Sequence, residues 1–88
     1  MSYTIEISPK AEKFLDRQSD KTVIKINRAF SKLEENPYYS QELDIKKLAG
    51  CKGDYRLRIG QLRILYTVFR DKKQIYVYKI ARRSGVYK

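Results

Sequence analysis

The chain has 88 residues, which suits one small domain, and we expect residues 1–88 to form a single folding unit. It contains one cysteine and no histidine, so an internal disulfide is excluded and a zinc site is not expected. Its apolar runs are too short to cross a membrane, and its N-terminal segment lacks the basic and apolar regions of a signal peptide. We therefore expect a cytoplasmic protein that does not span a membrane.

The positive charge, +10 in total, is concentrated in the second half of the chain. Residues 1–45 contain seven lysines and arginines and eight acidic residues, whereas residues 46–88 contain thirteen lysines and arginines and only two acidic residues, Asp54 and Asp71. Such an asymmetry favours a polyanionic partner. Nucleic acid is the first candidate, an acidic protein the second and a membrane surface the third. The alternative without a partner is a solvated basic surface.

The first half of the chain predicts a strand followed by two helices. Apolar residues alternate over residues 3–7, as in a half-buried strand. Ser8-Pro9 suits the cap and first position of a short helix that extends to about Gln18. Ser19-Asp20 is the candidate cap of a second helix, which Asn36-Pro37 ends. Because the link between the helices is so short, we expect an antiparallel helical hairpin. The second helix carries one apolar stripe along its length: Val23, Ile26, Phe30 and Leu33.

From Leu43 onward the apolar period changes to two residues, as in strands. Residues 43–48 suggest a segment that approaches the sheet, and residues 50–53 suggest a turn. Strands are predicted over residues 55–59, 62–69 and 74–80. The order is therefore β-α-α-β-β-β. This is an α+β fold in which the N-terminal helical hairpin packs on one face of a small, mostly antiparallel sheet.

Gly60-Gln61 predicts a two-residue hairpin loop of type II′, which requires glycine first. In this register Arg58 lies directly opposite Arg63, and Arg56 shares their face. We expect Arg63 at the surface. Like charges at paired positions destabilise a hairpin, so we interpret the pair as a place where a phosphate is held. The alternative is that both side chains extend apart into water. The opposite face is the predicted core: Tyr55, Leu57, Ile59, Leu62, Ile64, Tyr66 and Val68.

The next turn predicts where the last strand lies. A loop of two residues (71–72) or of four (70–73) gives the same register, which puts Arg63 opposite Ile80. The last strand then brings the tail, residues 82–87, close to the arginine pair.

Two kinds of residue extend this cluster. Arg83 and Tyr87, in the tail, are positioned to join it. Tyr76 and Tyr78 fall on the arginine-bearing face, where they either stack on bases or simply favour a strand. Cys51, in the predicted turn, is expected to be inert.

Three stretches of the chain resemble the RelE/ParE superfamily of toxins from toxin–antitoxin pairs. They are residues 43–50 (Leu-Asp-Ile-Lys-Lys-Leu-Ala-Gly), residues 55–66 (Tyr-Arg-Leu-Arg-Ile-Gly-Gln-Leu-Arg-Ile-Leu-Tyr) and residues 83–87 (Arg-Ser-Gly-Val-Tyr). Together they give the pattern L-x-G, Y-R-x-R-x-G-x-x-R-x-x-Y and R-x-x-V-Y. The order and lengths of the predicted elements resemble the family over nearly the whole chain.

The resemblance implies a toxin that enters the ribosomal A site and cleaves mRNA without a metal or other cofactor. The 2′-hydroxyl of the RNA would attack the adjacent phosphate. The implied partners are a cognate antitoxin protein, the ribosome and mRNA. By position, the resemblance assigns the reaction to Arg58, Arg63, Arg83 and Tyr87. Further RNA contacts are expected from Arg56, Lys46, Lys47, Lys52 and Arg82.

The residue that acts as general base stays open. Some relatives have lysines where Arg56 and Arg58 stand, and others use a histidine or a glutamate. Arginine, with a pKa above about 12, cannot serve as a base. Asp54 is the only carboxylate expected near the motif, and Tyr87 is the candidate for proton transfer. Members of the ParE branch poison DNA gyrase without cleaving RNA. A gyrase poison or a non-catalytic RNA-binding module is therefore the alternative function.

Overall fold

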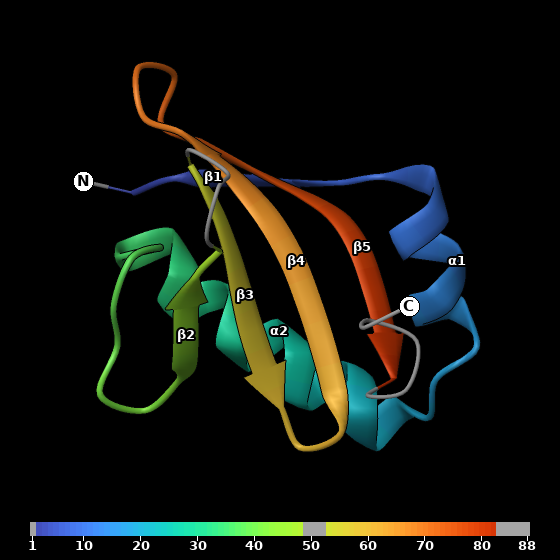
Figure 1. Cartoon of the computed structure of the whole chain (residues 1–88). Helices are drawn as coiled ribbons and strands as arrows, with labels where there is room; N and C mark the ends of the chain where they lie inside the picture. The colour runs from blue at the N-terminus through green and yellow to red at the C-terminus, as the bar shows by residue number, and fades with distance from the viewer. Residues whose placement is uncertain (1, 49–52, 83–88) are drawn as a thin grey trace.

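The computed structural model describes residues 2–48 and 53–82. Within these residues the strands form one sheet in the order β1-β5-β4-β3-β2 (Figure 1). β1 runs parallel to β5, and the other neighbours are antiparallel. The predicted α+β fold with a mostly antiparallel sheet is confirmed. The elements are β1 (Thr4–Ile7), α1 (Pro9–Asp16), α2 (Asp20–Glu35), β2 (Asp44–Lys47), β3 (Asp54–Ile59), β4 (Leu62–Phe69) and β5 (Gln74–Arg82).

β2 is one strand more than the sequence predicts. It forms an edge of the sheet and pairs antiparallel with β3, with Asp44 opposite Arg58 and Lys46 opposite Arg56. Only Ile45 among its four residues is partly buried. A strand this short has too little alternation to be distinguished from a loop, so the sequence indicated only an approach to the sheet.

Both helices begin where the sequence predicts. Ser8 Oγ accepts a hydrogen bond from the Ala11 N–H at 3.1 Å, and Pro9 occupies the first helical position. Ser19 Oγ accepts a hydrogen bond from the Thr22 N–H at 3.3 Å. Each cap satisfies a backbone N–H that the helix itself leaves without an acceptor.

In the described residues, no helix is long and apolar enough to cross a membrane.

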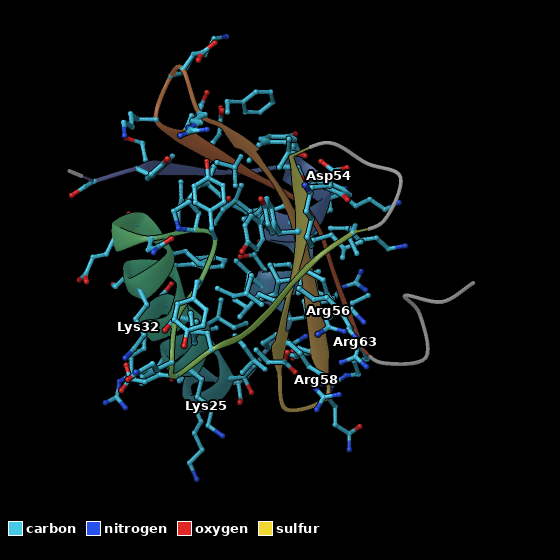
Figure 2. The ribbon with its side chains drawn as sticks, turned by 60° about the vertical axis from the view of Figure 1, so that its left-hand side comes forward. Lys25, Lys32, Asp54, Arg56, Arg58 and Arg63 are labelled. Atoms are coloured by element: carbon cyan, nitrogen blue, oxygen red, sulfur yellow. The ribbon has the colours of Figure 1, made fainter. Side chains whose placement is uncertain are left out.

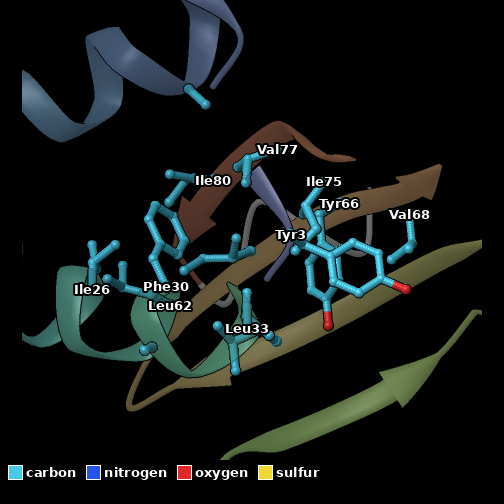
Figure 3. Packing of buried hydrophobic residues seen from close by; sticks show 14 residues of the cluster. Tyr3, Ile26, Phe30, Leu33, Leu62, Tyr66, Val68, Ile75, Val77 and Ile80 are labelled. Carbon is cyan, nitrogen blue, oxygen red and sulfur yellow. The ribbon is translucent and has the colours of Figure 1, made fainter. Parts of the chain in front are cut away.

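The core lies between α2 and the side of the sheet that α2 crosses (Figures 1 and 3). α1 packs beside β5. The predicted core positions of β4 are all buried, and Leu57 of β3 is fully buried, while Tyr55 and Ile59 are partly buried. Burying one such side chain contributes about 1.5–3 kcal/mol to stability. The fully buried side chains include Ile26, Leu33, Leu57, Ile64, Tyr66, Ile75 and Val77.

The β3–β4 hairpin has the predicted turn and register. Gly60 has a φ of 57°, and Gln61 does not have a positive φ, as the two central positions of a type II′ turn require. Arg58 pairs with Arg63 across the hairpin. The turn therefore fixes which side chains share a face.

The β4–β5 hairpin has a loop of four residues, 70–73, one of the two predicted lengths. Phe69 pairs with Gln74 across it, and the predicted register holds for the first four pairs. A β-bulge at Tyr78 then shifts the rest of β5 by one residue.

Beyond the bulge Arg63 pairs with Ala81, so the predicted Arg63–Ile80 pair is wrong. A bulge adds one unpaired residue to a single strand, and counting outward from the turn cannot reveal it.

Candidate functional site

The predicted arginine cluster lies on the side of the sheet away from α2 (Figure 2). We call this surface the basic face. Because side chains alternate along a strand, it is formed by every second residue of neighbouring strands. It contains two rows across the sheet: Asp44, Arg58, Arg63 and Ala81 form one, and Lys46, Arg56, Leu65 and Lys79 form the other. Five of these eight residues are cationic, so this surface attracts anions.

Lys79 is a member of the basic face that sequence reasoning missed. Val77 and Ile80 are both buried in the core, so Tyr78 and Lys79 between them both lie on the basic face. Strict alternation without the bulge would turn Lys79 toward the core. The sequence signal is the spacing of the apolar residues, which changes from two between Ile75 and Val77 to three between Val77 and Ile80.

Arg63 is the most deeply placed cation of the basic face. It lies on β4, which has a strand on either side, and only 4% of its surface is exposed. The expectation of a surface position is therefore wrong, because β4 is the middle strand of the five that the structure describes, whereas β3 has only the four-residue strand β2 beyond it. The opposing Arg58 side chain is 50% exposed. The site thus combines one buried and one accessible guanidinium at directly paired positions.

A carboxylate lies inside the arginine cluster. Arg56 Nη2 donates a hydrogen bond to Asp44 Oδ1 at 3.0 Å, and Arg58 Nε lies 3.2 Å from Asp44 Oδ2 in an ion pair. Each oxygen of Asp44 therefore contacts a different guanidinium. The expectation that Asp54 would be the only carboxylate near the motif is wrong, because β2 pairs with β3 and brings Asp44 beside Arg56 and Arg58. Asp54 itself accepts a hydrogen bond from the Thr67 hydroxyl at 2.6 Å.

Arg56 keeps a donor without an acceptor. Its side chain is 14% exposed, and in the described part of the chain its Nε is buried without a hydrogen-bond partner. Leaving a buried donor unsatisfied costs about 1–3 kcal/mol, and more for a charged group. An anion bound beside Arg56 would relieve this cost.

The remaining lysine and arginine predictions separate onto two faces. Lys46 lies on the basic face. Lys47 lies opposite Tyr55, on the side of the core. Arg82 pairs with a buried core residue and donates a hydrogen bond to Gln18 Oε1 at 3.2 Å, so it is directed toward α1. The structure therefore brings Lys46 to the predicted cluster, but not Lys47 or Arg82.

Four predictions fall on residues outside the described ranges: Lys52, Arg83, Tyr87 and Cys51. The predicted placement of Tyr76 and Tyr78 on the arginine-bearing face is confirmed. Tyr76 pairs with Thr67, and Tyr78 lies with Lys79 on this face at the bulge.

Among residues 2–48 and 53–82, no three acidic or cysteine side chains gather closely enough to hold a metal ion together.

Four other tyrosines form an aromatic cluster on the helix side of the sheet. Tyr55 stacks on Tyr66 with ring centroids 5.9 Å apart, and Tyr38 makes edge contacts with Tyr55 and Tyr3. Partial burial and the hydrogen bond with Tyr3 raise the pKa of Tyr38 to about 12. Burial also raises the pKa of Tyr66. A cleft of about 540 Å³ borders this cluster, lined by Tyr38, Lys47, Gly53, Tyr55, Val68 and Arg70.

Known proteins are similar to this chain in both sequence and fold. Residues 5–87 match the family described as the ParE toxin of type II toxin–antitoxin systems, parDE. The whole chain is 35% identical over 88 residues to a Methanocaldococcus jannaschii protein named "Putative toxin RelE1", of which it covers 98%. The RelE–RelB complex of Pyrococcus horikoshii contains a chain that superposes with a TM-score of 0.84 and 27% identity, over 94% of this chain and 97% of that one.

The intact RelBE complex of Escherichia coli gives a TM-score of 0.78 at 17% identity, over 92% of this chain and 96% of that one, which shows the shared fold. The resemblance inferred from the arginine pattern is thereby confirmed. The chain belongs to the ParE toxin family of type II toxin–antitoxin systems and is a toxin of the RelE/ParE type.

Proposed function

We propose that this toxin is an endoribonuclease that cleaves mRNA on the ribosome, by attack of the RNA's own 2′-hydroxyl and without a metal. The observation that carries the proposal is the basic face. Three arginines of the family pattern, Arg56, Arg58 and Arg63, lie together there with Lys46 and Lys79. A surface with this charge suits a single-stranded RNA backbone.

The chemistry of the arginines supports cleavage as well as binding. Attack by the 2′-oxygen gives a phosphorane whose extra negative charge must be stabilised. Guanidinium groups are planar forks that bind phosphate oxygens in two places. Arg58 and Arg63 lie at directly paired positions on two neighbouring strands, which suits a phosphate held between them. Removing one preorganised donor of this kind typically costs about 3–4 kcal/mol of transition-state stabilisation.

Proton transfer is assigned by position in the family pattern. Arg83 is proposed to bind phosphate beside Arg63, and Tyr87 is proposed to carry a proton, because an arginine does not titrate near neutral pH. Lys46 and Lys79 supply the amines of the basic face and are proposed to hold the RNA backbone. The ribosome would supply the orientation of the RNA for in-line attack.

We also propose a cognate antitoxin as the protein partner, acting with the toxin in the cytoplasm. The solved relatives include complexes of RelE with RelB, and the charge of the basic face favours an acidic segment in such a partner. Adding the antitoxin should stop cleavage.

A translation reaction with purified ribosomes and one defined message tests the proposed activity. We expect cuts, mapped by primer extension, only in messages that are being translated. The 5′ fragments should end in a 2′,3′-cyclic phosphate or its hydrolysed form. A message with a single 2′-deoxynucleotide at the mapped position should resist cleavage there. A message that stays intact at inhibitory toxin concentrations contradicts the proposal.

A gyrase poison is the second candidate, because the matched family carries the ParE description. The same toxin preparation added to gyrase and supercoiled DNA separates the two functions. Trapped or cleaved DNA together with intact message would favour the gyrase poison.

A further inference from the structure

The basic face already contains an anion, and that anion belongs to the protein. Asp44 Oδ1 accepts a hydrogen bond from Arg56 at 3.0 Å, and Asp44 Oδ2 lies 3.2 Å from Arg58 Nε. Two oxygens of one group thus contact two different guanidinium groups. The two non-bridging oxygens of a phosphodiester would be held by this pair in the same way.

The charges around Asp44 make it the exception on this surface. Across the two rows that define the basic face, Asp44 is the single acidic residue among five cations. Its side chain is 49% exposed and that of Arg58 is 50% exposed. A half-exposed ion pair is screened by water and contributes little to stability, so another anion can replace it.

Arg56 is more deeply buried than the carboxylate. Arg56 is 14% exposed and lies on β3, with strands on both sides, whereas Asp44 begins the four-residue edge strand β2. Arg56 also keeps its buried Nε without an acceptor in the described part of the chain. Asp44 therefore satisfies the site only in part.

We propose that Asp44 occupies the phosphate site formed by Arg56 and Arg58, and that an RNA phosphate must displace it in order to bind. Asp44 is then a built-in competitor that lowers the RNA affinity of the free toxin. The proposal rests on the proposed RNA-cleaving function, since RNA is the ligand that supplies the phosphate.

The same contacts would also suit a carboxylate that only orients the two guanidinium groups. The two roles predict opposite effects of removing the charge. A competitor weakens RNA binding, so its removal strengthens binding. An orienting residue supports RNA binding, so its removal weakens binding.

The test compares Asp44→Asn with Asp71→Asn. Both substitutions change the net charge by the same amount, but Asp71 is exposed in the β4–β5 loop, away from the basic face. The probe is a short single-stranded 2′-O-methyl RNA, which cannot be cleaved, and binding is followed by fluorescence anisotropy at several salt concentrations. We expect Asp44→Asn to bind about fivefold more tightly than Asp71→Asn, the effect of one unit charge about 4 Å away in water.

The salt dependence gives a second readout of the same experiment. The bound phosphate contacts Arg56 and Arg58 in both variants, so the slope of log K against log salt, which counts the neutralised phosphates, should be similar in the two, and the difference in affinity should persist across the salt range. Equal binding by the two variants, or weaker binding by Asp44→Asn at unchanged thermal stability, overturns the proposal. Asp44→Ser is the second variant if Asp44→Asn does not fold.

Inorganic phosphate separates this proposal from the proposed function. The Nε–H signals of Arg56 and Arg58 are followed by NMR while phosphate is added to the parental chain and to Asp44→Asn. We expect both signals to move at a lower phosphate concentration in Asp44→Asn. If they do so and the RNA probe binds while no message is cut, the nuclease proposal fails and the competitor stands. If message is cleaved but the signals respond alike in both proteins, only the competitor fails.

Discussion

Arg58 of β3 and Arg63 of β4 lie directly opposite each other on the basic face, one half exposed and the other almost completely buried. Like charges at such positions cost the hairpin up to about 1 kcal/mol. Because the pair destabilises the hairpin, we expect its two guanidinium groups to bind an anion. The form of the guanidinium, and not only its charge, should therefore matter for cleavage.

Arg63→Lys tests this expectation without leaving a cavity. Lysine keeps the charge and most of the length but loses the planar fork, so we expect cleavage of message on ribosomes to fall about 10²-fold. Single-turnover kinetics measure the loss, and thermal unfolding should show little change. Arg70→Lys in the exposed β4–β5 loop is the matched control and should cut like the parent. Cleavage by Arg63→Lys at the parental rate would remove the fork of Arg63 from the mechanism.

Lys46 and Lys47 are consecutive lysines of β2 that lie on opposite faces of the sheet. Lys46→Ala should weaken RNA binding by about threefold to tenfold and reduce the slope of log K against log salt by about 0.7, because one phosphate contact is lost. Lys47→Ala should have a much smaller effect on both. The two variants carry the same net charge, so a difference between them reports position alone. Equal losses would show that RNA does not dock through the basic face.

Lys79 reaches the basic face only because of the bulge at Tyr78. We expect Lys79→Gln to weaken RNA binding about as much as Lys46→Ala does, with unchanged stability. Lys72→Gln in the exposed β4–β5 loop provides the control of equal charge. If Lys79 faced the core instead, replacing it with an uncharged residue would raise the melting temperature and leave RNA binding alone.

The Tyr66 hydroxyl donates a 2.7 Å hydrogen bond to the Pro37 carbonyl inside the core. Tyr66→Phe removes this donor and leaves the carbonyl without it. The free energy of unfolding should therefore fall by about 1–2 kcal/mol at neutral pH. Urea unfolding monitored by circular dichroism measures the change. Tyr39→Phe alters an exposed tyrosine and should be silent. An unchanged midpoint in Tyr66→Phe would show that the bond contributes nothing.

The same variant should change how stability depends on pH. Burial raises the pKa of Tyr66 above its ordinary value of 10.0, and the pKa of Tyr38 is raised to about 12. Above pH 10 the unfolded chain releases these protons before the folded chain does. The contribution of the two tyrosines to the free energy of unfolding is therefore complete below pH 10 and is lost as the pH rises through 12. In urea titrations, the free energy of unfolding of Tyr66→Phe should decline less steeply between pH 9 and pH 12 than that of the parental chain. Parallel curves would assign the alkaline loss to other groups.

Tyr87→Phe separates proton transfer from stacking. If the hydroxyl moves a proton, cleavage should fall by about 10²–10⁴-fold while RNA binding stays near the parental value. If the ring only stacks on a base, the phenylalanine variant should retain most activity, and Tyr87→Ala should lose about 1–3 kcal/mol of binding. Cleavage rates measured across a range of pH, together with anisotropy of uncleaved RNA, distinguish the two. Parental cleavage by Tyr87→Phe would leave the proton carrier unassigned.

Local rules were enough for the features that depend on neighbours in the chain. The caps at Ser8 and Ser19 follow from side chains that accept hydrogen bonds at helix starts. The Arg58–Arg63 pair follows from Gly60, because a two-residue turn with glycine first allows one register. The charge asymmetry also indicates an anionic partner, and the spaced arginine pattern resembles this toxin family.

Only the tertiary structure decided the composition of the site. Asp44 meets Arg56 and Arg58 because an edge strand too short to be recognised pairs with β3. Lys79 turns outward because a bulge breaks the alternation, and Arg63 is buried because β4 is the middle strand of the described five-stranded sheet. These three outcomes depend on pairing between segments far apart in the chain. A residue's face, burial and ion partners are properties of that pairing, which residue types and local spacing do not specify.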